Sequence, residues 1–99
     1  MISWTLDELE QWVSIGRPGW PAVQVLSKAR PSLQAVQSFV GGHCEIAQNR
    51  LRVDGEPVQV LVNDEGRFNE LPVNPTASHV CTTVIVGNAM ILVGEARWE

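Results

Sequence analysis

Residues 62–75 read Val-Asn-Asp-Glu-Gly-Arg-Phe-Asn-Glu-Leu-Pro-Val-Asn-Pro, and this stretch decides how the chain folds. Asn and Asp tolerate the left-handed backbone conformation, and Gly adopts a positive φ without a steric cost. A strand that arrives at Val62 therefore turns between Asn63 and Gly66. The chain then passes two prolines and enters a second apolar run, which is interrupted by Gly87 and Asn88.

Alternating apolar residues predict a set of strands upstream of this turn. Residues 23–26 form a short strand by this criterion, and a period of two returns from His43 onward. Leu51 and Val53 then precede Asp54-Gly55, which is a strong tight-turn signal. On the return strand Val58, Val60 and Val62 share one face.

Two further segments carry helix signals. Pro31, at the first position of a helix, opens a segment that Gly41-Gly42 ends, with one apolar stripe made by Leu33, Val36, Phe39 and Val40. Near the end of the chain, Asn74-Pro75 caps one short helical turn that extends to Ser78.

The N-terminal segment is predicted to be a helix followed by a connector. Thr5 stands as the capping residue, Glu8 at the capping-box position and Gly16 as the stop. Residues 17–21, Arg-Pro-Gly-Trp-Pro, cannot be helical. We therefore divide the chain into an N-terminal helix and connector, residues 1–20, and a single small α+β domain, residues 21–99.

The last hairpin is the most apolar part of the sequence. It consists of Val84-Ile85-Val86, a Gly87-Asn88 turn and residues 90–93, Met-Ile-Leu-Val. Runs that do not alternate are typical of strands buried on both faces of a sheet. One core helix covers one face only, so the N-terminal helix or a second subunit must cover the other. We expect a homodimer slightly more than a monomer, because a helix of about ten residues cannot blanket such a sheet.

These elements predict an α+β fold with a mainly antiparallel sheet of four to five strands, one core helix packed on it and an extra N-terminal helix. The predicted core consists of Leu33, Val36, Phe39, Ile46, Val60, Val62, Val84, Val86, Ile91 and Val93.

The charged and apolar residue content argues against two classes of partner, nucleic acids and membranes. The 11 acidic residues outnumber the 7 basic ones and Lys28 is the only lysine, so a broad phosphate-binding surface cannot form and nucleic acid is an unlikely partner. No apolar run approaches the ~20 residues of a membrane span, and no targeting segment is recognisable. We expect a soluble cytoplasmic chain without membrane contact, whose two cysteines are inert thiols.

The sequence contains few signals of a catalytic site or a metal site. His43-Cys44 and His79-x-Cys81 offer zinc-ligand types. Neighbouring residues on a strand point to opposite faces, however, so these ligands do not converge and we expect no metal and no cofactor. Both cysteines lie in segments typical of core strands, where thiols are unreactive, and no Gly-x-Ser-x-Gly motif is present. We therefore expect no enzyme and no catalytic residue.

Candidate binding residues gather in the polar turn and among the four tryptophans. Carboxylates in a turn are ordinarily solvated, and Trp is also enriched in interface hot spots. For the four tryptophans we favour packing of the chain ends onto the core, and oligomer or partner contact is the alternative. The candidate ligand-binding or partner-binding residues are Asn63, Asp64, Glu65, Arg67, Asn69, Glu70, Trp20 and Trp98.

From about Val23 to Gly94 the chain resembles the family catalogued as domain of unknown function 3846, which occurs mostly in bacteriophages, plasmids and some bacterial chromosomes. The resemblance rests on residues 39–45 (Phe-Val-Gly-Gly-His-Cys-Glu), on residues 62–66 and 71–74 of the quoted stretch, and on residues 84–88 (Val-Ile-Val-Gly-Asn). The family has no accepted catalytic residues, so the resemblance implies none here.

Two functions of different kinds remain, beside a third in which the chain is a structural dimer without a ligand. The first is a small interaction module of a mobile genetic element, such as a phage, plasmid or gene cassette, which binds a protein partner or itself without catalysis. The alternative is a small-ligand binder or minor enzyme that uses the loop of residues 63–74, which requires Arg67, Asn69 and Glu70 to line a cavity.

Overall fold

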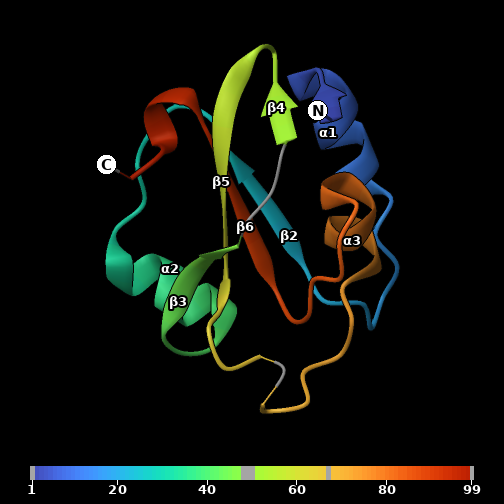
Figure 1. Ribbon diagram of the computed structural model, residues 1–99, viewed down its shortest axis with the longest axis vertical. Helices are drawn as coiled ribbons and strands as arrows, with labels where there is room; N and C mark the ends of the chain where they lie inside the picture. The colour runs from blue at the N-terminus through green and yellow to red at the C-terminus, as the bar shows by residue number, and fades with distance from the viewer. Residues whose placement is uncertain (1, 48–50, 67, 99) are drawn as a thin grey trace.

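A computed structural model describes residues 2–47, 51–66 and 68–98 of the chain (Figure 1). Within these residues the fold is α+β, with a six-stranded sheet and three α-helices. The elements in chain order are β1 (Ile2–Trp4), α1 (Leu6–Ser14), β2 (Val23–Leu26), α2 (Leu33–Val40), β3 (Cys44–Ala47), β4 (Leu51–Val53), β5 (Glu56–Asn63), α3 (Pro75–Cys81), β6 (Ala89–Val93) and the 3₁₀ turn η1 (Gly94–Ala96).

The sheet is mixed, with the strand order β1-β4-β5-β6-β2 and with β3 also paired to β5. β5 is antiparallel to β3, β4 and β6, whereas β1 is parallel to β4 and β2 is parallel to β6. The expectation of a mainly antiparallel sheet of four to five strands is therefore only partly correct. The parallel pairs join segments far apart in the sequence, which no local pattern reveals.

The central position of β6 agrees with its composition. β6 lies between β5 and β2, and all five of its residues are buried. Helices lie on both faces of the sheet at this point, so a continuous apolar run replaces the alternation of a half-exposed strand. This part of the predicted terminal hairpin is confirmed.

The other arm of that hairpin is not a strand. Val80 lies in α3, and the chain from Thr83 to Asn88 is a connector in which only Val86 forms a single bridge, to Val73. The reason is the length of α3. The predicted single turn continues to Cys81, and Thr82 ends the helix in the left-handed conformation with φ of 50°. Too little chain remains before β6 for another strand.

Two hydrophobic clusters occupy the two faces of the sheet. α2 packs through Val36 and Val40 on Leu61, Met90 and Leu92. The opposite face, with Val60, Val62, Ile91 and Val93, is covered by α1 and α3, which contribute Leu9, Ala77, Val80 and Cys81. Figure 1 shows α2 on one side of the sheet and α1 with α3 on the other. Helices of a single chain thus cover much of both faces of the sheet. The homodimer expectation assumed that one face is left uncovered, and this assumption does not hold.

Three residues of the predicted core are exposed. Leu33, Ile46 and Val84 retain 54%, 52% and 55% of their accessible surface. Leu33 begins α2, Ile46 lies on an edge strand, and Val84 lies in the connector after α3, so each has apolar neighbours on one side at most. Val36, Val60, Val62, Ile91 and Val93 are buried, whereas Phe39 and Val86 are half-buried.

Local signals at the helix ends are largely confirmed. Thr5 and Glu8 form the reciprocal capping box of α1, which ends at Ser14 just before Gly16. Pro31 is not the first helical residue, because the hydroxyl of Ser32 accepts the hydrogen bond from the Ala35 amide and makes Ser32 the N-cap of α2. Gly41, at φ of 87°, ends α2 as expected.

The N-terminal segment shares the sheet and the core of the remaining chain. β1 pairs with β4 in register from Ile2 opposite Leu51 to Trp4 opposite Val53. Leu9 of α1 is fully buried in the cluster beneath α3. The division at residue 20 stays a prediction.

None of the helices among the described residues is long and apolar enough to cross a membrane.

Candidate functional site

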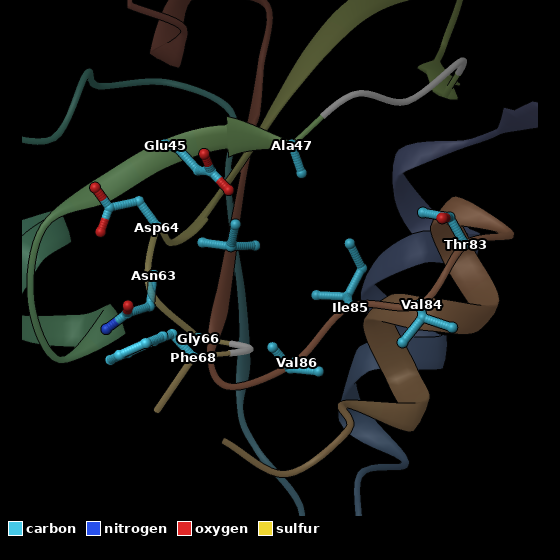
Figure 2. A pocket seen from close by; sticks show the side chains of 11 residues that line it. Glu45, Ala47, Asn63, Asp64, Gly66, Phe68, Thr83, Val84, Ile85 and Val86 are labelled. Carbon is cyan, nitrogen blue, oxygen red and sulfur yellow. The ribbon is translucent and has the colours of Figure 1, made fainter. Parts of the chain in front are cut away.

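A groove opens on the sheet face that α1 and α3 cover, at the part of this face that neither helix reaches (Figure 2). It lies between β3 with the end of β5 on one side and residues 83–86 on the other, and its volume is about 530 Å³. We call it the strand groove. Its lining residues are Glu45, Ala47, Val62, Asn63, Asp64, Gly66, Phe68, Thr83, Val84, Ile85 and Val86.

Strand pairing sets the floor of the strand groove. Glu45 stands opposite Val62 and Ala47 opposite Val60, so side chains of both strands project from the same face. Val62 and Ile85 are 8% and 5% exposed, and both line the groove. Figure 2 shows the side chain of Ile85 directed into the space between the two sides of the groove. The floor is therefore apolar.

The far wall of the strand groove is fixed by hydrogen bonds to α3. The Ser78 hydroxyl accepts from the Ile85 amide at 2.9 Å and donates to the Ile85 carbonyl at 3.2 Å. The Ile85 carbonyl also accepts from the Asn74 amide at 2.7 Å. The connector is thus held in one place without belonging to a strand, which makes this wall rigid.

The near wall is the turn at the end of β5. The Asn63 side chain donates to the Val40 carbonyl at 3.2 Å and accepts from the Glu65 amide at 2.8 Å. The Asp64 amide donates to the His43 carbonyl at 3.0 Å. Asn63 is buried, so it builds the turn and has little capacity left for a ligand.

Phe68 stands at the rim of the strand groove with 88% of its surface exposed. Val84 is exposed on the opposite rim. An exposed aromatic ring at the rim of a groove with an apolar floor is a candidate contact residue, because aromatic residues are enriched at protein interfaces.

The described charges of the strand groove have one sign. Glu45 and Asp64 are its only charged lining residues within the described parts of the chain, and both are exposed. The groove therefore presents an apolar floor beneath an acidic edge.

The structure separates the predicted site residues. Asn63 and Asp64 line the strand groove, whereas Asn69 and Glu70 do not line it, and Arg67 lies outside the described residues. Glu65 and Asn69 are linked instead by a main-chain hydrogen bond of 2.8 Å within the turn. Of the three residues that the alternative function, a small-ligand binder or minor enzyme, requires around a cavity, Asn69 and Glu70 are thus outside the lining of this groove.

The two predicted tryptophans differ from each other. Trp98 is half-buried against the α2 cluster, and its indole N–H donates to the Pro31 carbonyl at 3.0 Å. Trp20 is 43% exposed, with the Arg17 guanidinium carbon 5.7 Å from its ring centroid. Trp98 is a packing residue, and Trp20 remains a candidate for contact.

The cysteines and histidines do not form a reactive group. Burial raises the pKa of the Cys81 thiol to about 11, and burial also raises the pKa of Cys44, so both thiols are protonated near neutral pH. His79 stacks on Trp12 with ring centroids 4.4 Å apart. Within the described parts of the chain, no three His, Cys, Asp or Glu side chains are placed to hold a metal ion.

The main site residues that sequence reasoning missed are Phe68, Thr83 and Val84. Phe68 carried a signal, because it is a lone aromatic residue in a polar turn. Val84 gave a misleading signal, because its apolar neighbours predict a buried strand.

The family described as Domain of unknown function (DUF3846) matches this chain over residues 13–98. Neither the curated proteins nor the solved structures contain a match.

Proposed function

The chain belongs to the DUF3846 family, and on this premise we propose that it is a small binding module that holds an extended segment of a partner protein in the strand groove without catalysis. The observation that carries the proposal is the position of Phe68, an almost fully exposed aromatic ring at the rim of an apolar floor. Exposed aromatic residues beside apolar pockets are typical anchors of protein interfaces.

The sheet edge beside the groove favours an extended segment as the occupant. β3 and β4 pair with the same edge of β5, and β1 then pairs with β4 from outside. The outer edge of β3 pairs with no strand among the described residues, whereas the outer edge of β4 pairs with β1. A peptide that adds a strand there would lie in line with β1 and would direct alternate side chains toward the groove.

The charge of the rim favours a basic partner segment. Glu45 and Asp64 attract Lys or Arg side chains that flank an apolar anchor. Two copies of this chain would bring acidic rims together, so a different protein is a better occupant than a second copy. Homodimerisation through the groove is the competing outcome.

We propose that this binding takes place in the cytoplasm and serves a mobile genetic element; the family resemblance supports the second part of this proposal. Neighbouring genes test this context: phage or plasmid genes on both sides in most genomes that carry the family would support it.

Selection from a displayed library of random 12-residue peptides tests the function. We expect enriched sequences that combine alternating apolar residues with Lys or Arg. In fluorescence anisotropy, the selected peptides should bind Phe68→Ser and Glu45→Lys at least ten-fold more weakly than the parent chain. Leu33→Ser, a change of another exposed apolar residue, on α2 and outside the groove lining, is the control and should bind normally.

Two results would overturn the proposal. One is a library that yields no enriched sequence, or peptides that Phe68→Ser binds as well as the parent. The other is a dimer in sedimentation velocity at micromolar concentration that Phe68→Ser converts to a monomer.

A further inference from the structure

A second hollow lies between the end of α1 and the start of α3, and it shares no lining residue with the strand groove. Its volume is about 340 Å³. We call it the tryptophan pocket, and it is lined by Trp12, Ile15, Gly16, Arg17, Trp20, Pro75 and Thr76. Two indoles and a proline make it strongly aromatic and apolar.

The wall made by Trp12 is rigid. Its indole N–H donates to the Thr76 carbonyl at 3.3 Å, which ties α1 to the first turn of α3. Its ring also contacts His79 at 4.4 Å and Trp4 at 6.5 Å between centroids. These contacts already hold the ring before a ligand binds, so its side chain loses little further freedom on binding. This lowers the entropic penalty of binding.

The second indole of the lining is Trp20, which the connector leaves 43% exposed. The Trp20 amide donates to the Arg17 carbonyl at 3.1 Å, and Gly19 between them has a φ of 89°. This turn places the Arg17 guanidinium over the Trp20 ring. Among the described residues that line the pocket, Arg17 is the only charged one.

We propose that the tryptophan pocket binds a small planar aromatic anion, with its ring between Trp12 and Trp20 and its acidic group at Arg17. The volume is near the lower end of the ~300–1,000 Å³ range of small-molecule sites, which are mostly apolar with few polar groups. Aromatic rings stack favourably on indoles in offset or edge-on geometry. A carboxylate accepts hydrogen bonds from guanidinium in a charge-assisted pair.

Arg17 decides the sign of the ligand charge. A cationic ligand would compete with the guanidinium for the face of Trp20 and be repelled by it. The carboxyl end of α1 lies beside the pocket and carries roughly half a negative charge, which opposes an anion but is smaller than the full charge of Arg17. A free small molecule is the occupant that we propose, because the pocket has room for about one ring system.

Three naphthalene probes with the same ring and different charges test this inference: 2-naphthoate, neutral 2-naphthamide and cationic 2-(aminomethyl)naphthalene. Isothermal titration calorimetry should show naphthoate binding at least five-fold tighter than the amide, and the amine weakest. In ¹H–¹⁵N spectra, naphthoate should shift the indole signals of Trp12 and Trp20 and leave that of Trp98 in place.

Variants separate charge from stacking. Arg17→Gln should reduce naphthoate affinity to that of the amide and leave amide binding unchanged, whereas Trp20→Ala should abolish both. Arg52→Gln is the matched control, because it changes the net charge equally away from the pocket. Equal affinities of naphthoate and amide for the parent chain, absence of binding at millimolar concentration, or shifts centred on Trp98 would overturn the proposal. Peptide binding in the strand groove is measured separately, so either proposal can fail alone.

Discussion

The side chain of Asn74 donates a hydrogen bond from Nδ2 to the main-chain carbonyl of Gly87 over 2.8 Å. The same Nδ2 donates to the Ala22 carbonyl at 3.1 Å, and Oδ1 accepts from the Ala77 amide at 3.0 Å. Asn74 is fully buried. One amide thus joins the start of α3, the chain entering β2 and the chain entering β6, and it holds the connector that forms one wall of the strand groove.

We expect Asn74→Ala to lower the free energy of unfolding by about 3 kcal/mol. It takes this donor from the Gly87 carbonyl, at roughly 1–3 kcal/mol for a group that stays unsatisfied, and it removes a helix cap worth about 1 kcal/mol. The Ala22 carbonyl keeps its hydrogen bond from the Ala89 amide. Urea unfolding measures the change. Asn69→Ala, at an exposed position of the turn, is the control and should stay within about 0.5 kcal/mol of the parent. Equal stability of the two variants would contradict this account of Asn74.

Gly66 lies in the turn that forms the near wall of the strand groove, and it is packed against Val86 of the far wall. A Cβ at this position would lie 2.8 Å from Val86 Cγ2 and 3.3 Å from the Asn63 carbonyl oxygen. Overpacking of this kind costs about 1–3 kcal/mol, so we expect Gly66→Ala to be destabilised by that amount in urea unfolding. At Gly16 a Cβ would meet only an ordinary contact of 3.5 Å, so Gly16→Ala is the control.

A double-mutant cycle identifies the origin of this strain. Adding Val86→Ala to Gly66→Ala removes the closest clash, so the double variant should be more stable than the sum of the single effects predicts, by about 1 kcal/mol. Strictly additive effects would show that Val86 already moves aside without strain.

Leu9 tests how firmly α1 belongs to the core. Its side chain is fully buried in the cluster formed with strands of the sheet. Truncation of such a residue costs about 2–5 kcal/mol, so Leu9→Ala should lower the midpoint of urea unfolding in one cooperative transition. Ile15→Ala, just after the same helix and 64% exposed, should have little effect. If Leu9→Ala instead left the main transition unchanged, α1 would be an appendage.

The local elements of this fold could be predicted from the sequence because their signals are local. Each of these signals acts on backbone groups only a few residues away, and in the structure each is a helix cap or a turn. They are Thr5 with Glu8, Gly41, Asp54-Gly55 and Asn74. The continuous apolar run of β6 likewise predicts a strand that is buried on both faces, whatever its position in the sheet order.

The sheet order and the candidate sites could not be predicted in this way. The parallel pair of β1 with β4 depends on contacts between residues about fifty positions apart. Val84 has the composition of a strand, but α3 continues to Cys81 and leaves Val84 in a connector. The strand groove exists because α3 ends where it does, and no spacing in the sequence encodes that.

The buried thiol of Cys81 makes stability depend on pH in the alkaline range. Burial raises its pKa to about 11, above the value of about 8.5 expected in the unfolded chain. The native state therefore favours the protonated thiol. The resulting stability is fully present below pH ~8.5 and is lost as the pH rises toward 11, by about 3 kcal/mol in total.

We expect urea unfolding at a series of pH values to show this loss in the parent chain and not in Cys81→Ala. Few other groups titrate in that window, because the chain has no tyrosine and one lysine. Cys81→Ala should be less stable than the parent at pH 7, since it opens a small cavity, and the two curves should converge as the pH approaches 11. Cys44→Ala is the control: its thiol is only half-buried, so this variant should keep most of the alkaline loss. Curves for the parent and Cys81→Ala that stay parallel from pH 8 to 11 would show that the Cys81 thiolate is tolerated in the core.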